Sequence, residues 1–181
     1  MMKILAFAAS SSRKSINKQL AAYAASKYAD LEVEETQIEV LDLNDYELPL
    51  FSEDKEEELG QPALAQDFLN KIGACDALII SFAEHNGSYS AAYKNLFDWC
   101  SRINPKVYQG KPLLMLATSP GPGGAASVLA AATNSAPYFQ ADLKAQLSIP
   151  KFYDNFDVDK QCISNVELEA QLVAAVALLQ G

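Results

Sequence analysis

Residues 4–17 read ILAFAASSSRKSIN, and this stretch predicts the class of fold. Its first six residues, Ile4 to Ala9, are all apolar, as in a parallel strand that is buried on both faces. Apolar side chains then recur at helical spacing from Ile16 to Tyr28, and Ser15 stands at the N-cap position. A buried strand, a short polar loop and a helix follow one another, which is the order of an α/β protein.

The same order recurs along the chain. Apolar runs at residues 77–82, 112–118 and 143–149 predict further buried strands, and residues 33–43 predict a more exposed one. Helical spacing marks residues 62–73, 92–103 and a segment from about 125, while Ser164 to Glu167 fit a capping box before a last helix. Residues 44–60 hold Pro49 and an acidic run, and predict a solvated loop. We therefore expect a parallel sheet with helices on both faces, and ligands at the carboxyl ends of its strands.

Composition limits the function further. A chain of 181 residues fits one domain, 1–181, and its net charge of −9 disfavours nucleic acids and anionic membranes as partners. Residues 30–58 carry 13 of the 23 acidic residues and one base, so the first loop lies outside the acidic segment. Three separated cysteines, taken as packing thiols, and a single histidine give no metal site. The N-terminal apolar run is too short for a membrane span and lacks a signal-peptide layout, so we expect a cytoplasmic protein.

Three polar loops are expected at one edge of the sheet. The first, Ser10 to Asn17, combines hydroxyls, Arg13 and Lys14 with a helix N-terminus, which suits a phosphate group; an ordinary capped turn is the alternative. The second, Ala83 to Ser90, contains Asn86 and Gly87, which permit a sharp turn beside a planar ring. The third, Ser119 to Gly124, has three glycines and two prolines and lets the backbone approach a ligand. The sequence contains no G-x-G-x-x-G after the first strand, no P-loop and no G-x-S-x-G elbow.

With these loops the sequence resembles the NADPH-dependent FMN reductases of flavodoxin-like fold, which include chromate, quinone and azo-dye reductases. The family's second motif, P-E-Y-N-G-S-Y-P followed by K-N-x-x-D-W, corresponds to residues 83–90, AEHNGSYS, and 94–99, KNLFDW. Its first loop, G-S-x-R-x-x-S-x-N, resembles residues 10–17 if the loop here is one residue shorter, with Ser11, Arg13, Ser15 and Asn17 at its phosphate-binding positions. Its third loop, S-P-G-x-x-G-G, resembles residues 119–125. This chain departs from the family at the first-loop glycine, at Ala83 and Ser90 for proline, at His85 for tyrosine and at Ala125 for glycine.

The resemblance implies a three-layer sandwich with five parallel strands in the order 2-1-3-4-5. It also implies that the chain binds FMN non-covalently, with NADPH or NADH as co-substrate. In such enzymes two electrons pass in a ping-pong reaction to quinone, azo, flavin or similar small acceptors. The resemblance further implies a homodimer or homotetramer. The flavin would carry the chemistry, so no catalytic side chain is expected. The residues expected to bind FMN are Ser10, Ser11, Ser12, Arg13, Ser15, Ile16, Asn17, Glu84, His85, Asn86, Gly87, Ser119, Pro120, Gly121, Gly123 and Gly124.

Two other functions remain open on the same fold. A flavodoxin-type electron carrier would dock on protein partners, although its first loop is usually rich in Thr and Gly and lacks the Arg13 and Lys14 pair seen here. A flavin-free binding module is the other alternative, and the altered loop around His85 is its only support. Arg13 or Lys14 would also be able to reach the 2′-phosphate of NADPH. The helix that carries Trp99 is the expected subunit contact.

Overall fold

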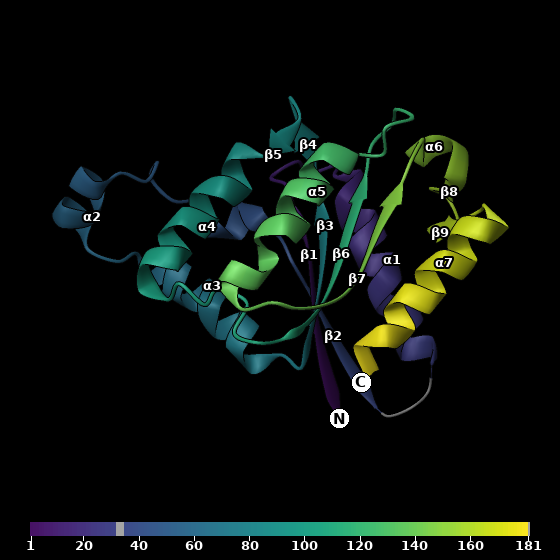
Figure 1. Cartoon of the computed structure of the whole chain (residues 1–181), viewed down its shortest axis with the longest axis horizontal. Helices are drawn as coiled ribbons and strands as arrows, with labels where there is room; N and C mark the ends of the chain where they lie inside the picture. The colour runs from purple at the N-terminus through teal and green to yellow at the C-terminus, as the bar shows by residue number, and fades with distance from the viewer. Residues whose placement is uncertain (32–34, 181) are drawn as a thin grey trace.

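The structure is a computed structural model that describes residues 1–31 and 35–180. At its centre five parallel strands lie in the order β2-β1-β3-β6-β7, which confirms the expected order (Figure 1). The strands are β1 (Met2–Ala9), β2 (Thr36–Leu41), β3 (Ala77–Phe82), β6 (Pro112–Thr118) and β7 (Asp142–Ile149). The part of the expected second strand that falls on residues 32–34 lies outside the described residues.

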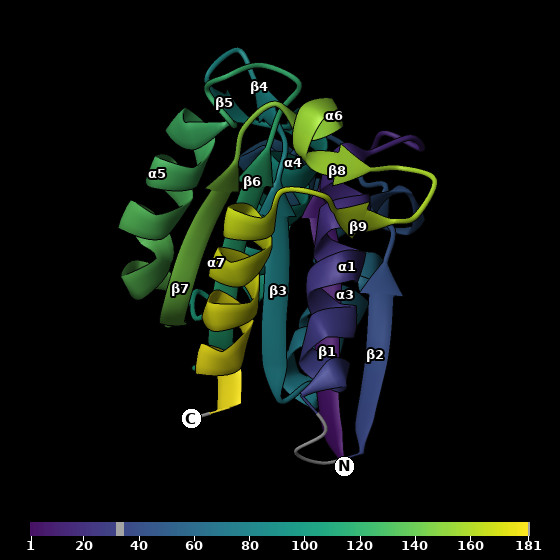
Figure 2. The same cartoon turned by 90° about the vertical axis from the view of Figure 1, so that its right-hand side faces the viewer.

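Helices cover the sheet on both faces, as Figure 2 shows from the side of α1 and α7. One face carries α1 (Ile16–Asp30) and α7 (Val166–Ala177), and the other carries α3 (Ala63–Ala74), α4 (Ala91–Ile103) and α5 (Ala126–Ser135). Leu5 and Phe7 of β1 pack under α3, and Ile4 and Ala6 pack under α1. Residues 4–9 of the strand are buried on both sides, which is why this part of its sequence is apolar throughout.

Short elements lie where the strands end. Strands β4 (Glu84–His85) and β5 (Ser88–Tyr89) form an antiparallel hairpin directly after β3. Helix α6 (Phe152–Asn155) follows β7 and leads into a second hairpin, β8 (Phe156–Asp157) with β9 (Cys162–Ile163). Figures 1 and 2 show β4, β5 and α6 together at the top edge, at the carboxyl ends of the main strands. The loops therefore meet at one edge, as the sequence predicts.

The prediction of a solvated loop at residues 44–60 is wrong for much of that segment. It contains most of the 3₁₀ helix η1 (Leu43–Tyr46) and all of α2 (Glu53–Leu59). Ser52 caps α2 by accepting the Lys55 N–H at 3.1 Å, and three acidic residues in the first turn suit the positive end of the helix dipole. No residue of α2 is buried, so the acidic run is solvated but helical.

Smaller expectations also need adjustment. The cap of α7 is Asn165 rather than Ser164, because Asn165 Oδ1 accepts the N–H groups of Glu167 and Leu168. Two other 3₁₀ turns, η2 (Ala136–Phe139) and η3 (Leu178–Gln180), follow α5 and α7.

Cys75 and Cys100 are buried packing thiols as expected, whereas Cys162 is partly exposed. In residues 1–31 and 35–180, no helix combines the length and apolar character needed to cross a bilayer.

Candidate functional site

A cavity of about 260 Å³ lies at the carboxyl ends of β1, β3 and β6. All three loops singled out in the sequence contribute to its wall. The residues that line it are Ser10, Ser12, Lys14, Ser15, Ile16, Asn17, Ala83, Glu84, His85, Thr118, Ser119, Pro120 and Tyr153. Strand β1 separates β2 from β3 in the sheet, so this cavity sits where the strand order reverses, the usual ligand position in an open α/β sheet.

The first loop presents a positive, donor-rich end of α1 to this cavity. Ser15 caps the helix by accepting the Lys18 N–H at 3.1 Å. Within the described part of the chain, the N–H groups of Ile16 and Asn17 have no protein acceptor. The Arg13 and Lys14 side chains are exposed, and neither pairs with an acid of residues 1–31 or 35–180. Vacant N–H groups at a helix N-terminus beside two unpaired cations form a donor set for an anion.

Asn17 has a role that the sequence does not reveal. Its side chain is buried, and its Nδ2 donates to the Thr118 carbonyl at 3.2 Å. Its Oδ1 accepts the Ser81 hydroxyl at 2.7 Å and the Thr118 N–H at 3.1 Å. The amide thus joins α1 to the ends of β3 and β6 beneath the cavity. The Asn17 side chain is therefore a structural tie, since its oxygen accepts two hydrogen bonds and its nitrogen donates one within the protein. Its backbone N–H is left for a ligand.

The second loop is the β4–β5 hairpin. Asn86 and Gly87 have φ angles of 52° and 77°, the left-handed pair of a type I′ turn, as the Asn-Gly sequence predicts. The exposed His85 is on the strand before this turn. Ser90 fixes the far end of the hairpin, because its hydroxyl donates to the Ala9 carbonyl at 2.8 Å and accepts the Tyr93 N–H. The hairpin is therefore anchored to the end of β1.

The third loop is held by the segment that follows β7. The backbone N–H groups of Lys151 and Phe152 donate to the carbonyls of Gly121 and Ser119 at 2.9 and 3.0 Å. Gly124 has a φ of 57°, and an added Cβ there would collide with the Ser148 hydroxyl, so glycine is required by the protein itself. A Cβ added to Gly121 or Gly123 meets no atom within 4 Å, so there the absent side chain leaves open space.

Ala125, which stands where the family motif has its last glycine, is also left-handed, with a φ of 60°. This backbone costs a residue with a Cβ about 1 kcal/mol. The Ala125 methyl group is buried in the core beneath α5. Burial of one methyl group returns about 0.8 kcal/mol, so alanine is tolerated at this position.

The cavity includes most, but not all, of the expected residues. Ser11 instead lines a neighbouring cavity of about 360 Å³ between the first loop and α4. The other expected residues outside the cavity wall are Arg13, Asn86, Gly87, Gly121, Gly123 and Gly124. Four lining residues were not among those expected to bind FMN: Lys14, Ala83, Thr118 and Tyr153. The first three neighbour expected residues in the sequence, whereas Tyr153 comes from α6, which no loop motif indicated.

The K-N-x-x-D-W residues on α4 hold the segment before α2. Asn95 Nδ2 donates to the carbonyls of Leu48 and Pro49, each at 3.1 Å, and its Oδ1 accepts the Phe51 N–H at 2.8 Å. The indole N–H of Trp99 donates to the Pro49 carbonyl at 2.8 Å. Trp99 is fully buried, so it contributes to the core and not to a subunit contact. This part of the motif therefore has a structural role.

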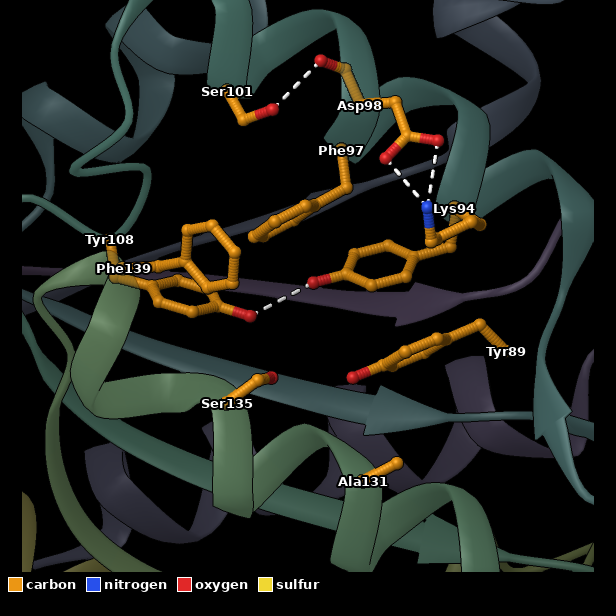
Figure 3. Close-up of a pocket in the computed structure, with 10 residues that line it drawn as sticks. Tyr89, Lys94, Phe97, Asp98, Ser101, Tyr108, Ala131, Ser135 and Phe139 are labelled. Atoms are coloured by element: carbon orange, nitrogen blue, oxygen red, sulfur yellow. Dashed lines mark hydrogen bonds and ion pairs between the residues drawn. The ribbon is translucent and has the colours of Figure 1, made fainter.

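The outer face of α4 borders an aromatic groove of about 290 Å³ with α5 (Figure 3). Tyr89, Tyr93, Phe97, Tyr108 and Phe139 line it, and the hydroxyls of Tyr93 and Tyr108 lie 3.0 Å apart, within hydrogen-bond distance. Burial raises the pKa of both phenols well above the usual value, so they stay protonated at neutral pH. At the rim, Lys94 pairs with Asp98 at 2.7 Å.

Curated proteins resemble part of this chain in sequence. The chain is 37% identical over 89 residues to an NAD(P)H-dependent FMN reductase of Pseudomonas aeruginosa, covering 49% of this chain and 46% of that protein. It is 34% identical over 80 residues to a quinone reductase of Escherichia coli K12, covering 44% and 43% of the two chains. The matched region thus spans less than half the length of these curated relatives.

Solved structures share the fold over the whole chain. The flavoenzyme NAD(P)H:(acceptor) oxidoreductase FerB of Paracoccus denitrificans superposes with a TM-score of 0.72 at 23% identity, covering 99% of this chain and 98% of that one. An FMN-dependent NADH-azoreductase of Bacillus anthracis in complex with FMN gives 0.68 at 13% identity, with 100% of both chains covered. Residues 2–154 match the family described as NADPH-dependent FMN reductase. With this match over most of its length, the chain belongs to the NADPH-dependent FMN reductase family.

Proposed function

We propose that residues 1–181 form a single domain that binds FMN non-covalently and acts as an NAD(P)H-dependent oxidoreductase. The observation that carries this proposal is the vacant, positively charged end of α1 in a cavity at the switch point of the sheet. The family match and the names of the relatives support the same reading.

The donor set suits the FMN phosphate. The N–H groups of Ile16 and Asn17 and the hydroxyl of Ser12 supply hydrogen bonds, and Arg13 and Lys14 supply charge. Hydrogen bonds from such groups to a dianion are stronger than those between neutral partners. No acidic residue lies in the first turn of α1 to oppose the charge.

The rest of the cavity wall suits a flat ring, one face of which would stay open to solvent. Ala83, Glu84 and His85 form one side of the cavity, Ser119 and Pro120 another, and Tyr153 stands at the rim. Bound FMN would supply the redox chemistry by taking a hydride from NAD(P)H and returning two electrons to a quinone, azo compound, flavin or similar small acceptor that enters in turn. The chain's residues bind and orient, and none of them needs to transfer a proton.

Binding is tested first by titrating purified protein with FMN and following flavin absorbance and fluorescence. The double variant Arg13→Ala/Lys14→Ala should weaken FMN binding at least about tenfold, because it removes the Lys14 ammonium from the cavity wall and the neighbouring Arg13 charge. Lys106→Ala is the matched control, because it removes an exposed cation beyond the far end of α4. Purified protein that is colourless and gains no flavin absorbance with FMN would overturn the cofactor assignment.

Turnover is tested with the FMN-loaded protein. Oxidation of NADPH or NADH is followed with a quinone, an azo dye or free flavin, and parallel double-reciprocal lines are expected for two substrates that enter one site in turn. If Arg13→Ala changes neither FMN retention nor the preference for NADPH, this side chain does not contact the 2′-phosphate. Yellow protein that oxidises neither nucleotide would favour a flavodoxin-type carrier instead.

The proposal includes a cytoplasmic homodimer or homotetramer. The aromatic groove between α4 and α5 supports a second copy as its occupant, because it adjoins the hairpin at the site and exposes part of Tyr89 and Phe97. Light scattering coupled to size exclusion gives the oligomeric state, and a monomer at micromolar concentration would contradict this part. Cell fractionation tests the location.

A further inference from the structure

Helix α5 begins without a cap of its own. Its N-cap residue is Ala125, which has no side-chain acceptor, and its backbone is left-handed. The first N–H groups of a helix need acceptors from outside it, usually the N-cap side chain, which accepts from the second or third residue of the helix. In α5 the third residue is Val128, and its N–H would have no partner within the helix.

Glu84 supplies the missing acceptor from another part of the chain. Its Oε2 accepts the Val128 N–H at 2.9 Å, across a separation of 44 residues. Figures 1 and 2 show why this is possible, because the β4–β5 hairpin lies beside the end of α5 at which that helix begins. A carboxylate at this position also complements the positive end of the helix dipole.

This contact joins the two loops that face each other across the cavity. Glu84 begins the hairpin that carries His85, and α5 follows directly from the third loop, which includes Ser119 and Pro120. The third loop is already tied to the β7–α6 segment through Gly121 and Ser119. The hairpin is tied to β1 through Ser90. The Glu84 carboxylate adds a hydrogen bond between the two sides.

We propose that Glu84 is a positioning residue, whose carboxylate holds the second and third loops at the separation that FMN requires. This role differs from the direct flavin contact that the family resemblance implies, because one carboxylate oxygen is already spent on α5. The inference rests on the proposed function for its ligand, but the tie between the loops can be measured without FMN. The cavity wall then carries opposite charges on two sides, with Lys14 beside the start of α1 and the Glu84 carboxylate beside α5.

Two variants separate the hydrogen bond from the charge. Glu84→Gln keeps the length and a carbonyl acceptor but loses the charge, and Glu84→Asp keeps the charge but is one methylene too short. Glu84→Ala removes both. Asp154→Ala is the matched control, because Asp154 is an exposed acid on α6 at the same edge. Each variant is titrated with FMN, and amide hydrogen exchange of Val128 is measured in the FMN-free protein.

Glu84→Ala and Glu84→Asp should raise the Kd for FMN about tenfold, shift the visible flavin band and speed Val128 exchange by about tenfold or more. For Glu84→Gln and for Asp154→Ala, the FMN Kd and the Val128 exchange rate should each stay within about threefold of wild type. The inference is overturned if Glu84→Ala leaves the FMN Kd unchanged, or if Glu84→Gln is as weak as Glu84→Ala. Wild-type protein that binds no FMN while Val128 remains protected overturns the cofactor assignment instead.

Discussion

Replacing Asn17 by alanine should destabilise the protein although the side chain lies at the edge of a ligand cavity. The change removes three hydrogen bonds, two with the backbone of Thr118 and one with the Ser81 hydroxyl. Ser81 and Thr118 are 0% and 1% exposed, so water cannot easily replace the lost partner. At about 1 kcal/mol for each bond, the loss is about 3 kcal/mol. For a chain of this size that corresponds to about 6 to 12 °C in Tm.

The assay is urea unfolding of the FMN-free protein, followed by fluorescence and circular dichroism. We expect the midpoint to fall with an unchanged slope, because the same surface is exposed on unfolding. Ser15→Ala is the comparison, since it removes a single cap and should cost about 1 kcal/mol. A loss below about 1 kcal/mol for Asn17→Ala would refute the reasoning that the amide is a buried tie.

Asn17→Asp adds a pH signature to the same prediction. An aspartate keeps both accepting contacts but turns a charged oxygen toward the Thr118 carbonyl, which accepts from the amide in the wild type. Its carboxyl pKa should therefore rise on folding. A raised pKa contributes stability below the unfolded value that is lost as pH rises through the folded value, so the deficit against wild type should be smaller near pH 4 than at pH 7.

Three further predictions follow from other contacts. Asn95→Ala removes the clamp on residues 48–51, so amide exchange at Phe51 and proteolysis of that segment should speed up well before global unfolding, and equal protection would contradict the assigned role. A hydrogen bond from Lys18 lowers the pKa of Asp42 to about 2. Because this pair is partly exposed, the wild type should be more stable to urea than Asp42→Asn by about 1 kcal/mol at pH 7. A lowered pKa gives stability that is lost on acidification, so the difference should shrink between about pH 4 and 2. Ala125→Gly relieves the cost of a left-handed backbone, but it loses a buried methyl group and raises the conformational entropy of the unfolded chain. These effects oppose one another, so thermal unfolding should give a stability within about 0.5 kcal/mol of wild type.

Much of the fold could be predicted from local patterns. The buried strands β1, β3 and β6 have continuous apolar runs because both faces of the sheet are covered, and the turn at Asn86 and Gly87 follows from the backbone that those residues permit. The segment at residues 44–60 was harder to predict. Its acidic residues and Pro49 indicate solvent exposure, yet α4 contributes the Asn95 amide and the Trp99 indole that hold its backbone.

The sequence by itself determined the strand–loop–helix order and the chemical character of the three loops, because apolar periodicity, capping residues and charge act over a few neighbouring positions. Only the tertiary structure decided which polar side chains face a ligand and which face the protein. Asn17 and Glu84 both look like ligand contacts in the sequence, but their partners, Thr118 and Val128, lie 101 and 44 residues away. A hydrogen bond depends on distance and direction in space, and those were set when the sheet placed distant loops at one edge.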